Sequence, residues 1–190
     1  MKFNRRTAAG LLMILLLILL ALAAPLLSRF DPAKSDLLHR LMPPDAQHIL
    51  GTDYLGRDQF ARLLYGTRLS ISVSFLILTV SMLTGTTVGV ICGYFGGWVS
   101  EILMSVVDIL LAFPSMILAL AIAGLMGIGM KNTVLTLCAV SWIGYARMVR
   151  NLVLSLREQD YIKASRISGT PHLKIILIHI LPSIVTPVLT

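Results

Sequence analysis

Asp108 is the acidic residue best placed for chemistry, because it lies well inside hydrophobic sequence. Ionisable groups inside membrane segments are rare, and they commonly mark proton or ion pathways. Glu101 lies one heptad earlier, and a helix starting near Ser100 leaves Asp108 only about two turns deep, within reach of interfacial water. Two interpretations stay open, a structural pair or helix cap and a proton or ion site. Pro114 removes a backbone hydrogen bond and predicts a kink that suits a gate.

Sequence motifs of several enzyme classes are absent from the 190 residues. The sequence contains no Gly-x-x-x-x-Gly-Lys-Ser/Thr phosphate loop, no His-Glu-x-x-His, no Gly-x-Ser-x-Gly and no paired membrane acids. Cys92 and Cys138 fall in hydrophobic stretches and are interpreted as small apolar residues. We therefore expect no catalytic residue, no metal site and no cofactor in this chain. The competing classes are an intramembrane enzyme and an ion-coupled secondary transporter.

The composition is that of a membrane protein. Hydrophobic residues make up 56% of the sequence and charged residues 13%, with a mean hydropathy of +0.85, whereas soluble domains carry about 25% charge. A membrane-spanning helix needs about 20 apolar residues. Charge-free windows at or near this length cover residues 7–28, 69–100, 109–130 and 132–146, and another begins at 175. The sequence predicts an all-α, polytopic transmembrane helical bundle with about five spans, the last incomplete.

Basic residues indicate the orientation of the chain. Lys2, Arg5 and Arg6 precede the first window without an acid, and basic residues also outnumber acids around residues 150–174. Because such residues collect at cytoplasmic ends, both segments are expected in the cytoplasm, and the net charge of +7 needs no nucleic acid partner. We predict a cytoplasmic N-terminus and first transmembrane helix over 1–28, an extracytoplasmic segment over 29–68, and a core domain over 69–190. A cleaved signal peptide is the alternative for the first hydrophobic run.

Three glycines four residues apart, Gly85, Gly89 and Gly93, form a ladder on one face of the second predicted span. Such a ladder lets two membrane helices pack backbone to backbone. Packing within the chain and packing against a partner subunit are both compatible with it. Gly96 and Gly97 then predict a tight turn, so the next helix should run antiparallel.

Residues 160–182 form the long polar interruption of the second half of the sequence. Asp160 is expected to cap a helix that runs from Tyr161 to about residue 168, and Gly169 is expected to end it in the left-handed conformation. Thr170 can cap a second helix, with Pro171 at its first position. Two short helices should therefore meet at a sharp corner before the chain returns to the membrane.

The first of these helices has a surface suited to a close protein contact. Ala164, Ser165 and Gly169 are small and would let another protein approach the backbone, while Lys163 and Arg166 carry charge. A solvated cytoplasmic loop that is merely helical is the alternative, since charged loops between spans are common.

Several strings resemble one family in the expected order. Lys163-Ala164-Ser165, then Gly169, then residues 179–182 (HILP) resemble the EAA loop of ABC-type importer permeases. Residues 48–58 (HILGTDYLGRD) resemble the segment before the second span in the dipeptide, oligopeptide and nickel branch of these permeases. Residues 108–114 (DILLAFP) and 145–150 (YARMVR) are similar to the same branch. The resemblance covers roughly residues 31–182.

This resemblance implies a multi-pass permease subunit in a bacterial inner membrane, in contact with membrane lipid. Its implied partners are ABC ATPase subunits that bind ATP, a second permease subunit and an extracytoplasmic solute-binding protein. The implied ATPase-docking coupling helix, within the cytoplasmic loop 150–174, contains Tyr161, Lys163, Ala164, Ser165, Arg166 and Gly169. Residues 44–48 (PDAQH) and 164–166 (ASR) look closer to nickel permeases than to peptide permeases, so the cargo is expected to be nickel, or else dipeptides or oligopeptides.

Two departures from the family pattern stand out. The family continues through a sixth span, so the chain is expected to be C-terminally truncated, as a fragment or a shortened reading frame. The pattern also has an acid where this chain has Lys163. An acid would favour the helix N-terminus by roughly 0.3 to 1 kcal/mol, and lysine reverses that sign. We expect docking to survive through the small residues, with a changed charge requirement on the ATPase.

Overall fold

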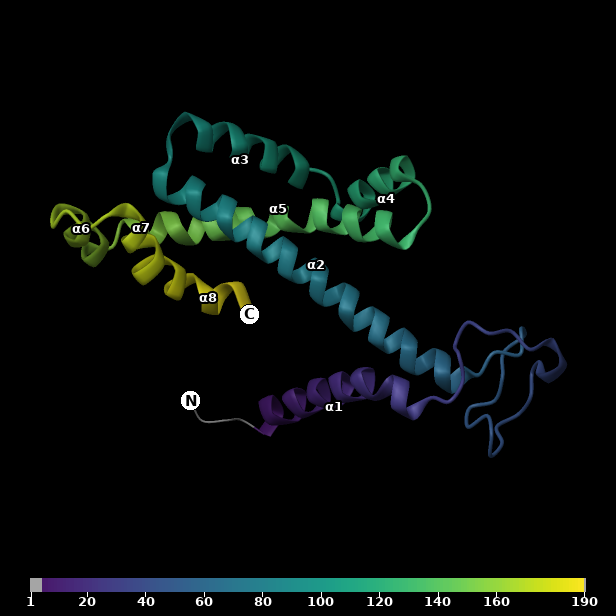
Figure 1. Ribbon diagram of the computed structural model, residues 1–190. Coiled ribbons are helices and arrows are strands. Elements are labelled where there is room, and N and C mark those ends of the chain that lie inside the picture. The colour runs from purple at the N-terminus through teal and green to yellow at the C-terminus, as the bar shows by residue number, and fades with distance from the viewer. Residues whose placement is uncertain (1–4, 190) are drawn as a thin grey trace. The chain divides into compact units, whose positions relative to one another are not determined.

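The computed structural model describes residues 5–189, so Lys2 and Thr190 lie outside the described part. Apart from one isolated bridge between Thr52 and Asp58, its regular structure is helical, which confirms the all-α expectation. The elements, labelled in Figure 1, are α1 Arg5–Leu27, η1 Leu37–His39, α2 Gln59–Phe95, α3 Gly97–Leu111, α4 Ser115–Met126, α5 Met130–Arg157, α6 Asp160–Ile167, α7 His172–Ile175, the π-helical turn η2 Ile176–Ile180 and α8 Leu181–Leu189.

The chain forms two compact units, residues 1–75 and residues 76–190. In the first unit, α1 exposes most of its leucines and buries Ala21 and Ala24, while Ala61 and Leu64 are buried in the first turns of α2. Between the two helices the chain runs through turns, one of them at Gly56, whose φ of +73° is left-handed. The expected boundaries at residues 28 and 68 stay predictions.

In the second unit, the glycine ladder of α2 lies against α5. A β-carbon built on Gly89 would lie 2.7 Å from the carbonyl oxygen of Ala146, and one on Gly93 would lie 2.8 Å from the Val153 β-carbon. The two backbones therefore approach as closely as the glycines allow, as the ladder predicted. This contact is within the chain.

The apolar helices that the sequence predicted are present, but their limits differ. Helix α2 begins ten residues before its charge-free window and continues through Arg62 and Arg68. Helix α5 runs on to Arg157, well beyond the window that ends at residue 146. A charge-free window measures the part of a helix suited to lipid, whereas backbone hydrogen bonding also continues through polar residues.

Among the described residues, α2 is the single helix long and apolar enough to cross a membrane. Helices α3 and α4 meet the same criterion only as a pair, and they are bent by 92°. The break lies at residues 112–114, and Pro114 precedes the first residue of α4. Proline has no N–H to continue the backbone hydrogen bonds of the helix, and it disfavours helical backbone at the preceding residue, Phe113. These two effects explain the sharp bend. The kink expected at Pro114 is confirmed, and the count of five spans is not.

Candidate functional site

The helical corner predicted at residues 160–182 is present, with its caps moved by one residue. The N-cap of α6 is Gln159, and Asp160 is the first helical residue, where its charge still suits the helix N-terminus. Gly169 has a φ of +75° and ends α6 as expected. Pro171 is the N-cap of α7 and not its first helical residue. The expected cap at Asp160 and the expected helical place of Pro171 are therefore wrong by one position.

One apolar side chain anchors α6 to the other helices of the second unit. Ile162 is fully buried and belongs to a cluster that joins α2, α5, α6, α7, η2 and α8. Its partners in this cluster include Tyr94, Val149 and Ile175. Figure 1 shows α6 and α7 at the end of α5. A short helix fixed on one side by a single buried residue leaves its remaining faces free for a partner.

The outward faces of α6 carry the residues that the sequence singled out. Tyr161, Lys163, Ala164, Arg166 and Gly169 are exposed, whereas Ser165 is half-buried. The hydroxyl of Ser165 donates a hydrogen bond of 2.8 Å to the carbonyl oxygen of Tyr161, so its polar atom is satisfied within the helix. The face available for contact is thus made of small and charged groups.

Sequence reasoning missed two apolar residues beside this face. Ile167 is 88% exposed at the end of α6, and Leu173 is 68% exposed in α7. Ile167 follows the buried Ile162 by five positions, about 140° around a helix, so the two cannot share one buried face. The sequence did offer a signal for this exposed residue, because Ile167 is apolar but lies on a different face of a short polar helix from Ile162. We name the surface of Ile167 and Leu173, together with Ala164 and Gly169, the corner surface.

Lys163 has a partner inside the chain. Its ammonium lies 3.1 Å from a carboxylate oxygen of Glu158, which immediately precedes the N-cap of α6. The hydrogen bond from Lys163 is the main cause that lowers the pKa of Glu158. Lys163 therefore places no unpaired cation on the helix, and Asp160 provides an acid in the first turn.

Tyr94, near the end of α2, connects to both short helices and was also missed. Its hydroxyl lies 2.9 Å from Nδ1 of His172 in α7. The guanidinium of Arg166 in α6 lies 5.6 Å from the centre of the Tyr94 ring. An Arg157 guanidinium N–H donates a 3.3 Å bond to the Tyr94 carbonyl oxygen. Because Arg166 of α6 and His172 of α7 both contact the buried side chain of Tyr94, a displacement of either short helix would act on the end of α2.

Asp108 forms an ion pair with Arg147 that joins α3 to α5, and both side chains are about half exposed. Close by in sequence, a cavity of about 330 Å³ is lined by Phe113 and Ser115, which flank Pro114, and by residues of α5. The structure thus pairs Asp108 with a basic residue and places the proline break beside a cavity.

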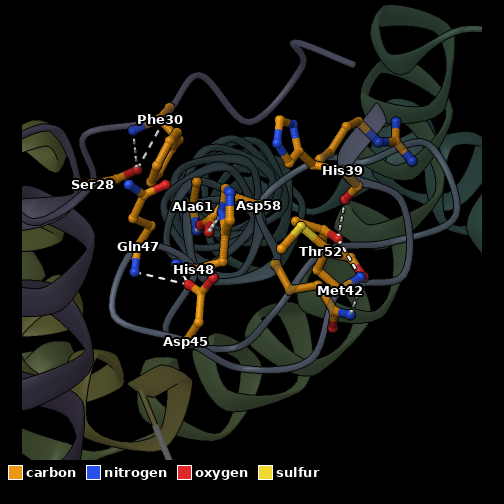
Figure 2. A network of polar contacts seen from close by, with 12 residues as sticks. Ser28, Phe30, His39, Met42, Asp45, Gln47, His48, Thr52, Asp58 and Ala61 are labelled. Atoms are coloured by element: carbon orange, nitrogen blue, oxygen red, sulfur yellow. Dashed lines mark hydrogen bonds and ion pairs between the residues drawn. The ribbon is translucent and has the colours of Figure 1, made fainter. Parts of the chain in front are cut away.

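A polar network holds residues 28–58 together (Figure 2). Nδ1 of His48 lies 2.9 Å from Oδ2 of Asp58, and the other carboxylate oxygen of Asp58 accepts a 2.6 Å bond from the Ala61 amide. Asp58 therefore caps α2 and binds the loop with one side chain. Thr52 donates its hydroxyl to the His39 carbonyl and accepts from the Met42 amide. The bonds of His48 with Asp58 and of Thr52 with His39 and Met42 join residues that are ten or more positions apart.

Asp53 is the charged centre of the same segment. It pairs with Arg57 at 2.8 Å and with Arg62, and it accepts bonds from the amides of Leu55 and Arg57. Burial opposes ionisation of this carboxyl, but the hydrogen bonds outweigh it and lower the pKa of Asp53 from 3.8 to about 2. The ionised carboxylate is therefore the form that the folded segment favours.

Acid is expected to weaken this segment over a defined pH range. Since the pKa of Asp53 is depressed in the folded state, its contribution is complete above pH 3.8 and is lost as the pH falls toward about 2. Thermal unfolding midpoints measured between pH 5 and pH 2 should fall for the wild type and fall less steeply for Asp53→Asn. The variant Asp31→Asn, at an exposed turn, should follow the wild type. An unchanged pH slope in Asp53→Asn would contradict this role.

Among the described residues, no three His, Cys, Asp or Glu side chains gather as a metal site would require.

Comparison with known proteins gives two matching families. Residues 85–190 match the family described as binding-protein-dependent transport system inner membrane component. Residues 1–44 match the N-terminal transmembrane domain of oligopeptide transport permease C.

Individual relatives cover nearly the whole chain. The dipeptide transport system permease protein DppC of Alkalihalophilus pseudofirmus is 40% identical over 189 residues, which is all of this chain and 62% of the relative. The nickel transport system permease protein NikC of Escherichia coli K12 is 39% identical over 180 residues, or 95% of this chain and 65% of the relative. The oligopeptide transport system permease protein OppC of Bacillus subtilis is 36% identical over 182 residues, 96% of this chain and 60% of the relative. The chain thus spans less than two thirds of their lengths.

Proposed function

Because the chain belongs to the family of binding-protein-dependent transport system inner membrane components, we propose that it acts as the permease subunit of an ABC importer for nickel, dipeptides or oligopeptides. The observation that carries this proposal is the construction of α6, which is anchored by the buried Ile162 and presents small and charged residues outward. A helix built in this way is suited to transmit force from a bound partner into the bundle.

In this proposal, the corner surface docks on a cytoplasmic ATPase subunit. Tyr161, Lys163, Ser165 and Arg166 would border the contact, and Ile167 would fill an apolar pocket of the partner. ATP would bind and be hydrolysed on the partner, since no phosphate loop occurs in the 190 residues. A movement of α6 and α7 would pass to α2 through the contacts that Arg166 and His172 make with Tyr94.

A second permease subunit would complete the transport path across the membrane, and a solute-binding protein would deliver cargo on the side of residues 29–68. The N-terminus would then lie in the cytoplasm. Asp108 would serve as a structural pair to Arg147, and Pro114 would allow α3 and α4 to move as a gate. The dipeptide and nickel relatives, at 40% and 39% identity, do not separate the two cargos.

Uptake into membrane vesicles tests the function. With the full-length subunit, its partner ATPases and a solute-binding protein, uptake of labelled nickel or a labelled dipeptide should require ATP and the binding protein. It should also survive a protonophore, and Asp108→Asn should keep this resistance. Uptake that is lost with the protonophore alone would support an ion-coupled transporter and would overturn the proposal.

A further inference from the structure

The first unit contains a cavity of about 630 Å³ between the end of α1 and the beginning of α2. Its apolar lining comes from Leu27, the last residue of α1, from Phe60, the second residue of α2, and from Phe30 and Ile49 in the intervening segment. This volume is in the range that holds small ligands.

The polar lining includes a cation, Arg29, that forms no ion pair within the described residues 5–189. Asp58 lines the cavity, but it is already bound by His48 and by the Ala61 amide. Arg29 also lines the cavity, is exposed, and forms no ion pair with any residue in the range 5–189. A guanidinium in this state is suited to a planar pair of hydrogen bonds with a phosphate or carboxylate.

The position of the cavity along α1 narrows the choice of ligand. The exposed leucines of α1 continue to Leu26, which is 87% exposed, and Leu27, which is 48% exposed, and Arg29 follows two residues later. In an inner membrane component, such an apolar face contacts lipid chains, and the first cation after it lies at the level of the headgroups. The cavity therefore opens where apolar surface gives way to charge.

We propose that this cavity binds the headgroup of a membrane phospholipid from the leaflet on the side of residues 28–58. The phosphate would pair with Arg29, the glycerol region would contact Phe30 and Ile49, and the acyl chains would lie along the exposed leucines of α1. This site is separate from the corner surface and does not depend on transport.

Native mass spectrometry tests the proposal on the full-length protein released from nanodiscs of phosphatidylethanolamine and phosphatidylglycerol. Arg29→Gln should lower the apparent affinity for retained phospholipid about tenfold, the loss expected for one charge-assisted contact. Ile49→Trp, which fills the cavity from an exposed position, should have a similar effect. Arg40→Gln removes an exposed arginine of the same segment that does not line the cavity, and it should retain lipid like the wild type.

Two further measurements test the need for a positive charge and the source of the phosphate. Arg29→Lys keeps the positive charge and should recover part of the lost retention. Soluble glycerophosphoethanolamine, which lacks acyl chains, should bind much more weakly than the lipid. Equal retention by Arg29→Gln and Arg40→Gln would overturn the site, and equal binding of the soluble headgroup would overturn the assignment to a membrane lipid.

Discussion

Replacement of Gly89 by valine is expected to separate α2 from α5 and to lower the free energy of unfolding by about 3 kcal/mol. A β-carbon at this position would lie 2.7 Å from both the Ala146 carbonyl oxygen and the Val149 β-carbon. Neither atom can yield easily, because one is backbone and the other belongs to a fully buried residue. The loss should appear as a lower midpoint of thermal unfolding in detergent.

Gly66 offers a matched control in the same helix. A β-carbon there would meet no atom within 4 Å, so Gly66→Val makes the same chemical change in open space. It should leave the unfolding midpoint close to that of the wild type, since valine has a better helix propensity than glycine. Equal destabilisation by the two variants would show that valine destabilises α2 whether or not another helix lies against it, and would contradict a specific role for the contact between Gly89 and α5.

The ladder was predictable because its physical cause is local in the sequence. Glycines at four-residue spacing lie on one helix face whatever surrounds them. The same holds for Pro114 and Gly169, since a missing N–H and a tolerance of positive φ belong to the residue itself. The sequence alone could not say which helix the ladder would meet, and the structure supplies α5 as the partner.

Other features depend on contacts that no local pattern encodes. The bond between Tyr94 and His172 joins residues 78 positions apart, so neither residue stood out in the sequence. Lys163 stood out because the family pattern has an acid at its position, and the structure shows that Glu158, just before α6, pairs with it. Long helices were also misjudged, because a window without charges records suitability for lipid and not where hydrogen bonding stops. The charge-free windows therefore locate the apolar helices but do not give their ends.

In the proposed docking, Ile167 is the residue expected to contribute most, because an apolar contact buried at the centre of an interface commonly provides much of its affinity. Ile167 is 88% exposed, while the anchor Ile162 lies about 140° away on the same helix. A change at Ile167 should therefore leave the fold of α6 intact. If the corner surface docks on an ATPase subunit, this residue is the part that the partner must cover.

Ile167→Ser is accordingly expected to reduce co-purification of the ATPase subunits by about thirtyfold, the equivalent of roughly 2 kcal/mol at a central contact. Leu38→Ser provides the control, since Leu38 is 92% exposed but belongs to residues 28–58, which the proposal places on the other side of the membrane. Both variants should unfold at the wild-type temperature, because neither side chain is buried. If they retain equal amounts of ATPase, docking does not depend on Ile167, and the role of the corner surface must be assigned to Leu173, Ala164 and Gly169.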